Sequence, residues 1–136
     1  MVGILVITHQ RLAEEFIATA ELIVGKIENC LGLSLDPNLP VGELRQQINQ
    51  AMDTVNDGNG VIVLTDMFGG TPSNLSLSFL NTEGIEVVTG VNLPMLLKLA
   101  QSREGQRVDE LARIIKDYGR RSISLASEIL DQEVGK

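Results

Sequence analysis

Short apolar runs in this chain alternate with longer segments in which apolar residues recur at helical spacing. The first run, Val2 and Ile4–Ile7, is rich in β-branched residues, which is typical of a strand covered on both faces. Similar runs occupy 61–64 and 85–88, and a shorter alternating run occupies 31–35. The pattern therefore predicts four strands.

Apolar residues spaced three or four positions apart predict helices between these strands. The third of these helices is expected to open with Thr71 as its N-cap and Pro72 as its first helical residue. Beyond the last one, Ser122–Ala126 alternates with a period of two, which favours a short edge strand, while a helix from Ser124 onward fits nearly as well. The predicted helices lie at 12–24, 41–55, 71–80, 92–99 and 108–118.

Strands that alternate with helices require right-handed crossovers and a mainly parallel sheet. The expected fold is an α/β three-layer sandwich, and its length favours one domain over residues 1–136. With the strand order 2-1-3-4, the first and third strands are neighbours at the switch point where open sheets of this kind bind ligands.

Composition narrows the classes of partner. A net charge of −7, with Arg120–Arg121 as the nearest approach to a basic cluster, argues against nucleic acid. The single Cys30 cannot close an internal disulfide, and with a single histidine it cannot build a familiar zinc site, so we expect no metal. No run approaches the ~20 apolar residues that span a bilayer, and no signal peptide is recognisable. We therefore expect a cytoplasmic protein.

The candidate chemistry lies where two predicted strands end. His9, the only histidine, follows the first strand, and Asp66 follows the third. In the proposed strand order these side chains share one crevice. A carboxylate that accepts a hydrogen bond from one ring nitrogen leaves the other nitrogen free to take a proton, a metal ion or a phosphoryl group.

The residues that follow Asp66 favour phosphate among these ligands. The backbone amides of Gly69 and Gly70, the hydroxyl of Thr71 and the start of the next helix offer several hydrogen-bond donors. The chain contains no P-loop, no G-x-G-x-x-G motif and no nucleophile elbow, so we expect neither a nucleotide nor another cofactor. Together these residues favour phosphoryl transfer between proteins.

Three stretches carry a resemblance to a known family: Ile7–His9, Thr65–Asn74 and Gly90–Leu96. In these stretches, and over essentially its whole length, the chain resembles the IIA domain of the mannose family of the bacterial phosphoenolpyruvate-dependent sugar phosphotransferase system. The resemblance implies that His9 is phosphorylated by the histidine phosphocarrier protein and passes the group to a IIB component. It also implies that Asp66 orients the ring and that Thr71 and nearby amides hold the phosphoryl oxygens.

The resemblance further implies a homodimer, in which a carboxyl-terminal strand pairs with the partner's sheet. Ser122–Ala126 is the segment expected to form that strand. The IIB component is expected on a separate chain, and membrane contact only through the IIC and IID transporter components. Phe68 is a candidate docking residue, because it is one of few aromatic residues and adjoins the site. Asn92 is a helix cap first and a candidate docking residue second.

Other interpretations remain open at this point. A stand-alone protein of this type could act in a regulatory phosphorelay, where a partner senses its phosphorylation without sugar transport. The related IIA domain of dihydroxyacetone phosphorylation shares the early histidine but lacks the Gly-Gly-Thr-Pro and Val-Asn-Leu-Pro stretches. A hydrolase that used His9 and Asp66 for acid/base chemistry would lack a nucleophile.

Overall fold

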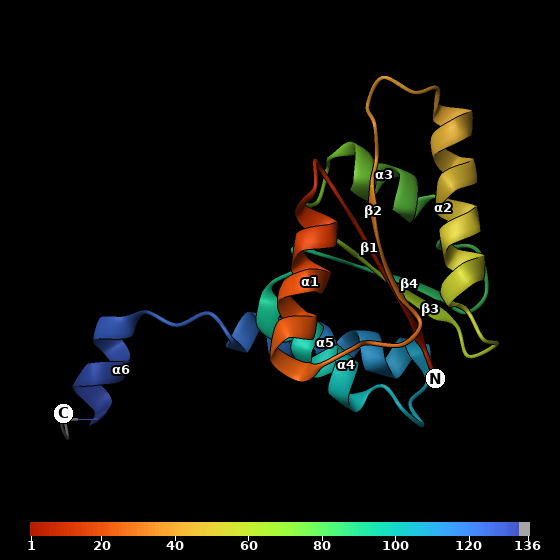
Figure 1. Cartoon of the computed structure of the whole chain (residues 1–136). Helices are drawn as coiled ribbons and strands as arrows, with labels where there is room; N and C mark the ends of the chain where they lie inside the picture. The colour runs from red at the N-terminus through yellow and green to blue at the C-terminus, as the bar shows by residue number, and fades with distance from the viewer. Residues whose placement is uncertain (134–136) are drawn as a thin grey trace.

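Four parallel strands form one sheet in the order β2-β1-β3-β4 (Figure 1). The computed structural model describes residues 1–133. Its fold class and strand order confirm the prediction from the hydrophobic pattern. The strands are β1 (Gly3–Thr8), β2 (Cys30–Ser34), β3 (Val61–Thr65) and β4 (Ile85–Thr89).

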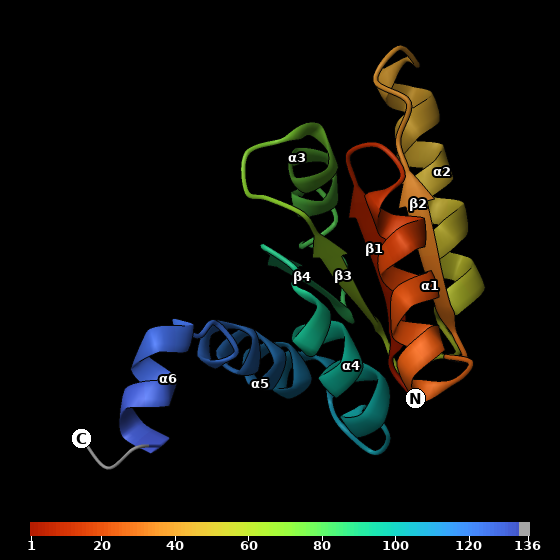
Figure 2. The same ribbon diagram turned by 60° about the vertical axis from the view of Figure 1, so that its left-hand side comes forward.

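Helices cover both faces of the sheet and complete three layers (Figures 1 and 2). One face carries α1 (Leu12–Val24), α4 (Leu93–Ser102) and α5 (Val108–Arg121). The opposite face carries α2 (Val41–Val55) and α3 (Thr71–Leu77). The last helix, α6 (Ala126–Glu133), stands away from these layers.

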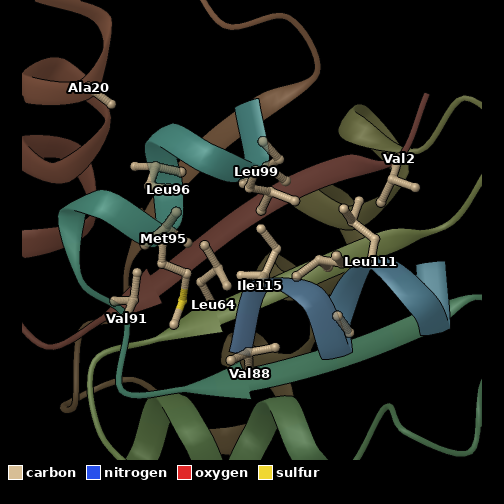
Figure 3. Close-up of a cluster of buried hydrophobic side chains, with 14 of the residues drawn as sticks. Val2, Ala20, Leu64, Val88, Val91, Met95, Leu96, Leu99, Leu111 and Ile115 are labelled. Atoms are coloured by element: carbon tan, nitrogen blue, oxygen red, sulfur yellow. The ribbon is translucent and has the colours of Figure 1, made fainter. Parts of the chain in front are cut away.

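Alternation along the central strands divides the hydrophobic core in two. On β1, Ile4 and Val6 belong to the cluster beneath α1, α4 and α5, whereas Leu5 and Ile7 belong to the cluster beneath α2 and α3. Successive side chains of a strand point to opposite faces, so a strand between two helical layers must be apolar throughout. Figure 3 shows the first cluster, where Ile115 of α5 packs among side chains of α4 and the sheet.

The strand register brings the ends of β1 and β3 together. Ile7 pairs with Thr65, so the residues that follow both strands emerge at the same edge of the sheet. The strand β1 runs one residue further than its apolar run, because Thr8 is buried and its hydroxyl accepts a hydrogen bond at 2.7 Å from the Ala13 N–H. This contact satisfies an otherwise free donor in the first turn of α1.

The helix α3 is shorter than predicted: it ends at Leu77 rather than at Leu80. After Leu77 the backbone continues in tighter turns, in which the N–H groups of residues 78–80 and 82 each bond a carbonyl three residues back. Serine side chains compete for the carbonyls of this helix, since the Ser76 hydroxyl donates to Pro72 O at 2.6 Å and the Ser78 hydroxyl to Leu75 O at 2.5 Å. Such local bonds disfavour a long regular helix.

The segment after α5 forms a helix rather than a strand in this single chain. Ser122–Leu125 forms no strand, and α6 begins at Ala126, two residues after the predicted helix start. Whether the same segment pairs with a second chain as an edge strand stays a prediction. Among the helices within residues 1–133, none is both long enough and apolar enough to cross a bilayer.

Candidate functional site

His9 and Asp66 form a hydrogen-bonded pair at the carboxyl ends of β1 and β3. Nδ1 of His9 lies 2.8 Å from Oδ2 of Asp66, and the His9 backbone N–H donates to the same oxygen at 3.0 Å. The other carboxylate oxygen accepts the Met67 N–H at 3.0 Å. Two of these contacts join the carboxylate to His9, and the third fixes it to the backbone of its own loop. The two residues lie together as the predicted strand order requires.

The charge on Asp66 decides which ring nitrogen carries the proton. Partial burial acts to raise the pKa of Asp66, but hydrogen bonds from the His9 backbone and ring outweigh it, so this pKa lies below its ordinary value. An ionised carboxylate only accepts hydrogen bonds, so Nδ1 must donate. In the neutral ring, Nε2 then keeps a free electron pair.

The ring that carries this nitrogen is partly open to solvent. The His9 side chain is 48% exposed, while that of Asp66 is only 14% exposed. The short turn after His9 contains Gln10 at φ 52°, a left-handed conformation that is uncommon outside glycine. The turn leads into α1, whose Ala13 N–H donates to the hydroxyl of the buried Thr8, the residue before His9. Burial thus holds the backbone of the site while the ring faces outward.

The loop after β3 provides the predicted donors beside the ring. Gly69 has φ 94°, which favours glycine, and Gly70 in extended backbone is the N-cap of α3. Thr71 is therefore the first helical residue rather than the N-cap, one position later in the helix than predicted. The N–H groups of Gly69, Gly70 and Thr71 form no backbone hydrogen bond within residues 1–133.

A cleft of about 460 Å³ opens beside His9 and Thr71. Its far wall comes from the segment after β2, including Asp36, which the predicted site does not include. The predicted strand order already indicates that this segment adjoins the site, because β2 is a parallel neighbour of β1 and ends at the same edge of the sheet. Arg11 is the one cationic residue in the cleft lining, which consists of His9, Gln10, Arg11, Ser34, Leu35, Asp36, Pro37, Asn38, Thr71 and Pro72.

The two candidate docking residues differ in their surroundings. Phe68 is 70% exposed in the loop beside the site, next to the exposed Met67. Asn92 is held by structural contacts: its Oδ1 accepts the Met95 N–H at 3.0 Å, and its Nδ2 donates to Gly119 O at 2.9 Å. These bonds cap α4 and tie it to α5, as expected for its first role. A docking role for either residue stays a prediction.

Within residues 1–133, no group of three or more histidine, cysteine, aspartate or glutamate side chains could hold a metal ion. His9 has one carboxylate partner, and that partner already accepts three N–H groups. The arrangement is instead suited to nucleophilic or phosphoryl-transfer chemistry at Nε2.

Comparison with known proteins identifies the family. The model of the EIIA-man family, described as "PTS system fructose IIA component", matches residues 3–116. The chain belongs to this family. PTS IIA components are phosphotransferase-type proteins of sugar transport systems, and this IIA chain is of the mannose, fructose and sorbose type.

Relatives and solved structures agree with that assignment. The IIA chain is 31% identical over 124 residues, or 90% of its length, to the PTS system mannose-specific EIIAB component of Escherichia coli K12. It is 26% identical over 133 residues to the PTS system fructose-specific EIIA component of Bacillus subtilis, covering 97% of this chain and 91% of that protein. It spans only 38% of the E. coli protein.

Two crystal structures show the same fold. The PTS IIA protein associated with the fucose utilization operon of Streptococcus pneumoniae is 32% identical, with a TM-score of 0.80 and coverage of 96% of this chain and 99% of that one. The EIIA component of Streptococcus agalactiae is 26% identical, with a TM-score of 0.84 and coverage of 94% and 99%. The α/β architecture is therefore shared with PTS IIA proteins.

Proposed function

We propose that this chain is a phosphoryl carrier that accepts a phosphoryl group on Nε2 of His9 from the histidine phosphocarrier protein and donates it to a IIB component. The observation that carries the proposal is the 2.8 Å contact between Nδ1 and Asp66 on a half-exposed ring. Family membership supports the class of reaction, and this contact supports the choice of His9.

In the proposed step, the Nε2 electron pair attacks phosphorus, and a nitrogen–phosphorus bond forms. The nitrogen–phosphorus bond of the donor breaks, and its electrons return to the donor nitrogen. The proton stays on Nδ1, so the phosphorylated ring becomes cationic. The Asp66 carboxylate stabilises this charge at 2.8 Å, as the carboxylate of a catalytic triad does for an imidazolium. Transfer to the IIB component reverses the step.

The transferred phosphoryl group carries negative charge on three oxygens, which need donors. The backbone N–H groups of Gly69, Gly70 and Thr71 have no backbone acceptor in the described residues. The Thr71 side chain lines the cleft with His9 and is exposed. We assign phosphate binding to these three residues, since donors fixed before the reaction stabilise developing charge at little cost.

Docking of the protein donor would involve the exposed loop beside the ring. Met67 and Phe68 are 53% and 70% exposed, and both follow Asp66 directly. Large apolar side chains next to a reactive group are typical of a protein interface. Asn92 would contribute through the shape of the adjoining α4 start, because its polar atoms are already bonded.

The proposal extends to the assembly. It takes the chain as a single IIA domain over 1–136, working in the cytoplasm and reaching the membrane only through IIC and IID components. It also includes a homodimer, which is supported by the outer edge of β4, where no further strand pairs within residues 1–133, and by exposed apolar side chains along the carboxyl-terminal segment. These side chains are Ile123, Leu125, Ile129 and Leu130.

The deciding experiment is phosphorylation in a reconstituted system. The chain is incubated with phosphoenolpyruvate, enzyme I and the phosphocarrier protein, and its mass is followed with and without acid treatment. We expect one added phosphate that is labile in acid, stable in base and absent from His9→Gln. Omission of enzyme I is the control. A wild-type chain that gains no phosphate, or a His9→Gln variant that still gains one, would overturn the proposal.

A further inference from the structure

Gly70 stands against the imidazole of His9. A Cβ atom added at Gly70 would lie 2.5 Å from Cε1 and 2.9 Å from Nε2 of that ring. Carbon atoms in good contact are about 3.5–4.0 Å apart, so no side chain fits between this backbone and the ring in its present position. The approach of backbone to ring is close because residue 70 has no side chain.

Backbone conformation does not explain this glycine. Gly70 has φ −87° and ψ 170°, an extended conformation that any residue adopts. The adjacent Gly69 is the opposite case, with φ 94° and no atom within 4 Å of an added Cβ. Gly69 therefore allows the left-handed turn, and Gly70 makes room for the ring.

The position of Gly70 is itself fixed. Its carbonyl accepts the Asn74 N–H at 2.8 Å, which joins it to the first turn of α3. The same loop holds the ring on its other side, because Asp66 bonds Nδ1 at 2.8 Å. The segment after β3 thus bonds the imidazole at Nδ1, and on the Cε1–Nε2 side it leaves no room for a side chain at position 70.

We propose that Gly70 is a positioning residue for His9, whose missing side chain lets the ring bond Asp66 while Nε2 stays clear for phosphorus. This inference rests on the proposed function. A methyl group at position 70 would either turn the ring away from Asp66 or occupy the approach to Nε2. Both changes hinder formation of the nitrogen–phosphorus bond, since a misplacement of about 1 Å at a reacting group can lower a rate on the order of 100-fold.

The test compares Gly70→Ala with Gly42→Ala, a matched control at an exposed position of α2 where an added Cβ meets nothing. Phosphorylation rates are measured with the phosphocarrier protein and with phosphoramidate, a small donor that needs no docking surface. We expect Gly70→Ala to be about 100-fold slower with both donors and Gly42→Ala to match the wild type. Wild-type rates in Gly70→Ala, or a loss confined to the protein donor, would overturn the inference.

Nitrogen-15 NMR of the imidazole reads the ring directly. We expect Gly70→Ala, but not Gly42→Ala, to shift the Nδ1 resonance, as the ring turns from Asp66, or the Nε2 resonance, as the methyl group crowds that nitrogen. An unchanged imidazole spectrum in Gly70→Ala would contradict a positioning role.

A thermal-unfolding cycle tests the contact without any phosphoryl transfer. Gly70→Ala should lower the Tm of the wild type more than that of His9→Ala, because the loss of the N-cap glycine acts in both backgrounds and the clash acts only where the ring is present. Equal effects in both backgrounds would overturn the inference. A wild-type chain that accepts phosphate from neither donor would instead refute the proposed function, and the cycle would still decide whether Gly70 and the ring compete for space.

Discussion

Polar side chains have different roles at the two ends of the parallel strands, which we call the carboxyl edge and the amino edge of the sheet. At the carboxyl edge, His9 is half exposed and bonded to Asp66 through Nδ1, which leaves Nε2 free. At the amino edge, Arg103 is only 3% exposed, and its guanidinium donates to Val2 O at 3.0 Å, to Asn29 O at 3.4 Å and to Glu28 O. The first arrangement keeps one reactive atom available, and the second joins strand ends.

The pKa values of the ionisable groups also differ between the amino edge and the carboxyl edge. Desolvation lowers the pKa of the Arg103 guanidinium, and burial raises the pKa of the nearby Cys30 thiol to about 12. A thiol with such a pKa stays protonated at neutral pH and is a poor nucleophile. At the other edge, hydrogen bonds keep Asp66 ionised. The comparison teaches that burial makes the amino edge structural, while partial exposure leaves the carboxyl edge reactive.

Replacement of Arg103 by Met should have the largest effect on stability. The variant keeps an apolar stem but leaves the carbonyls of Val2 and Glu28 without this donor. We expect the free energy of unfolding to fall by about 2–3 kcal/mol, with no change in the phosphorylation rate at a temperature where the chain stays folded. Urea denaturation measures the first quantity. Arg107→Met, at an exposed side chain paired only at the surface, is the control.

Asp66→Asn should mainly affect the rate of phosphoryl acceptance at the carboxyl edge. The amide oxygen can still accept a hydrogen bond, but the charge that stabilises the cationic phosphorylated ring is lost. We expect phosphoryl acceptance to slow on the order of 100-fold, with the fold retained. Quenched-flow mass spectrometry gives the rate, and circular dichroism checks the fold. An unchanged rate would show that the carboxylate does not orient the ring.

Phe68→Ala should have a smaller effect that depends on the phosphoryl donor. Because Phe68 is 70% exposed, its loss costs little stability. We expect the KM for the phosphocarrier protein to rise about fivefold, which corresponds to about 1 kcal/mol of docking free energy, while the rate with phosphoramidate stays the same. Leu22→Ala, which removes an 87% exposed apolar side chain near the far end of α1, is the matched control.

Acidification should produce the smallest effect. Since the folded chain lowers the pKa of Asp66, its ionised form stabilises the fold above the unfolded pKa of about 4. That contribution is lost as the pH falls through the lower folded pKa. The stability difference between the wild type and Asp66→Asn should therefore shrink below about pH 4 in urea denaturation. A difference that grew on acidification would contradict the assigned hydrogen bonds.

Much of the fold was predictable because its signals are local. The apolar runs identified all four strands, and the spacing of apolar residues identified the helices that cover them. The strand order 2-1-3-4 then required His9 and Asp66 to meet, which the 2.8 Å contact confirms. Local patterns were weaker at boundaries: serine side chains shorten α3, and the alternating tail continues into a helix.

The sequence by itself determined that one histidine and one carboxylate follow neighbouring strands beside a glycine turn. Only the tertiary structure decided which ring nitrogen is free, that a side chain at position 70 would clash with the ring, and that the segment after β2 forms the far wall of the cleft. The physical reason is that periodicity records which face of an element is buried. It does not record the distances between side chains from different elements, which packing fixes.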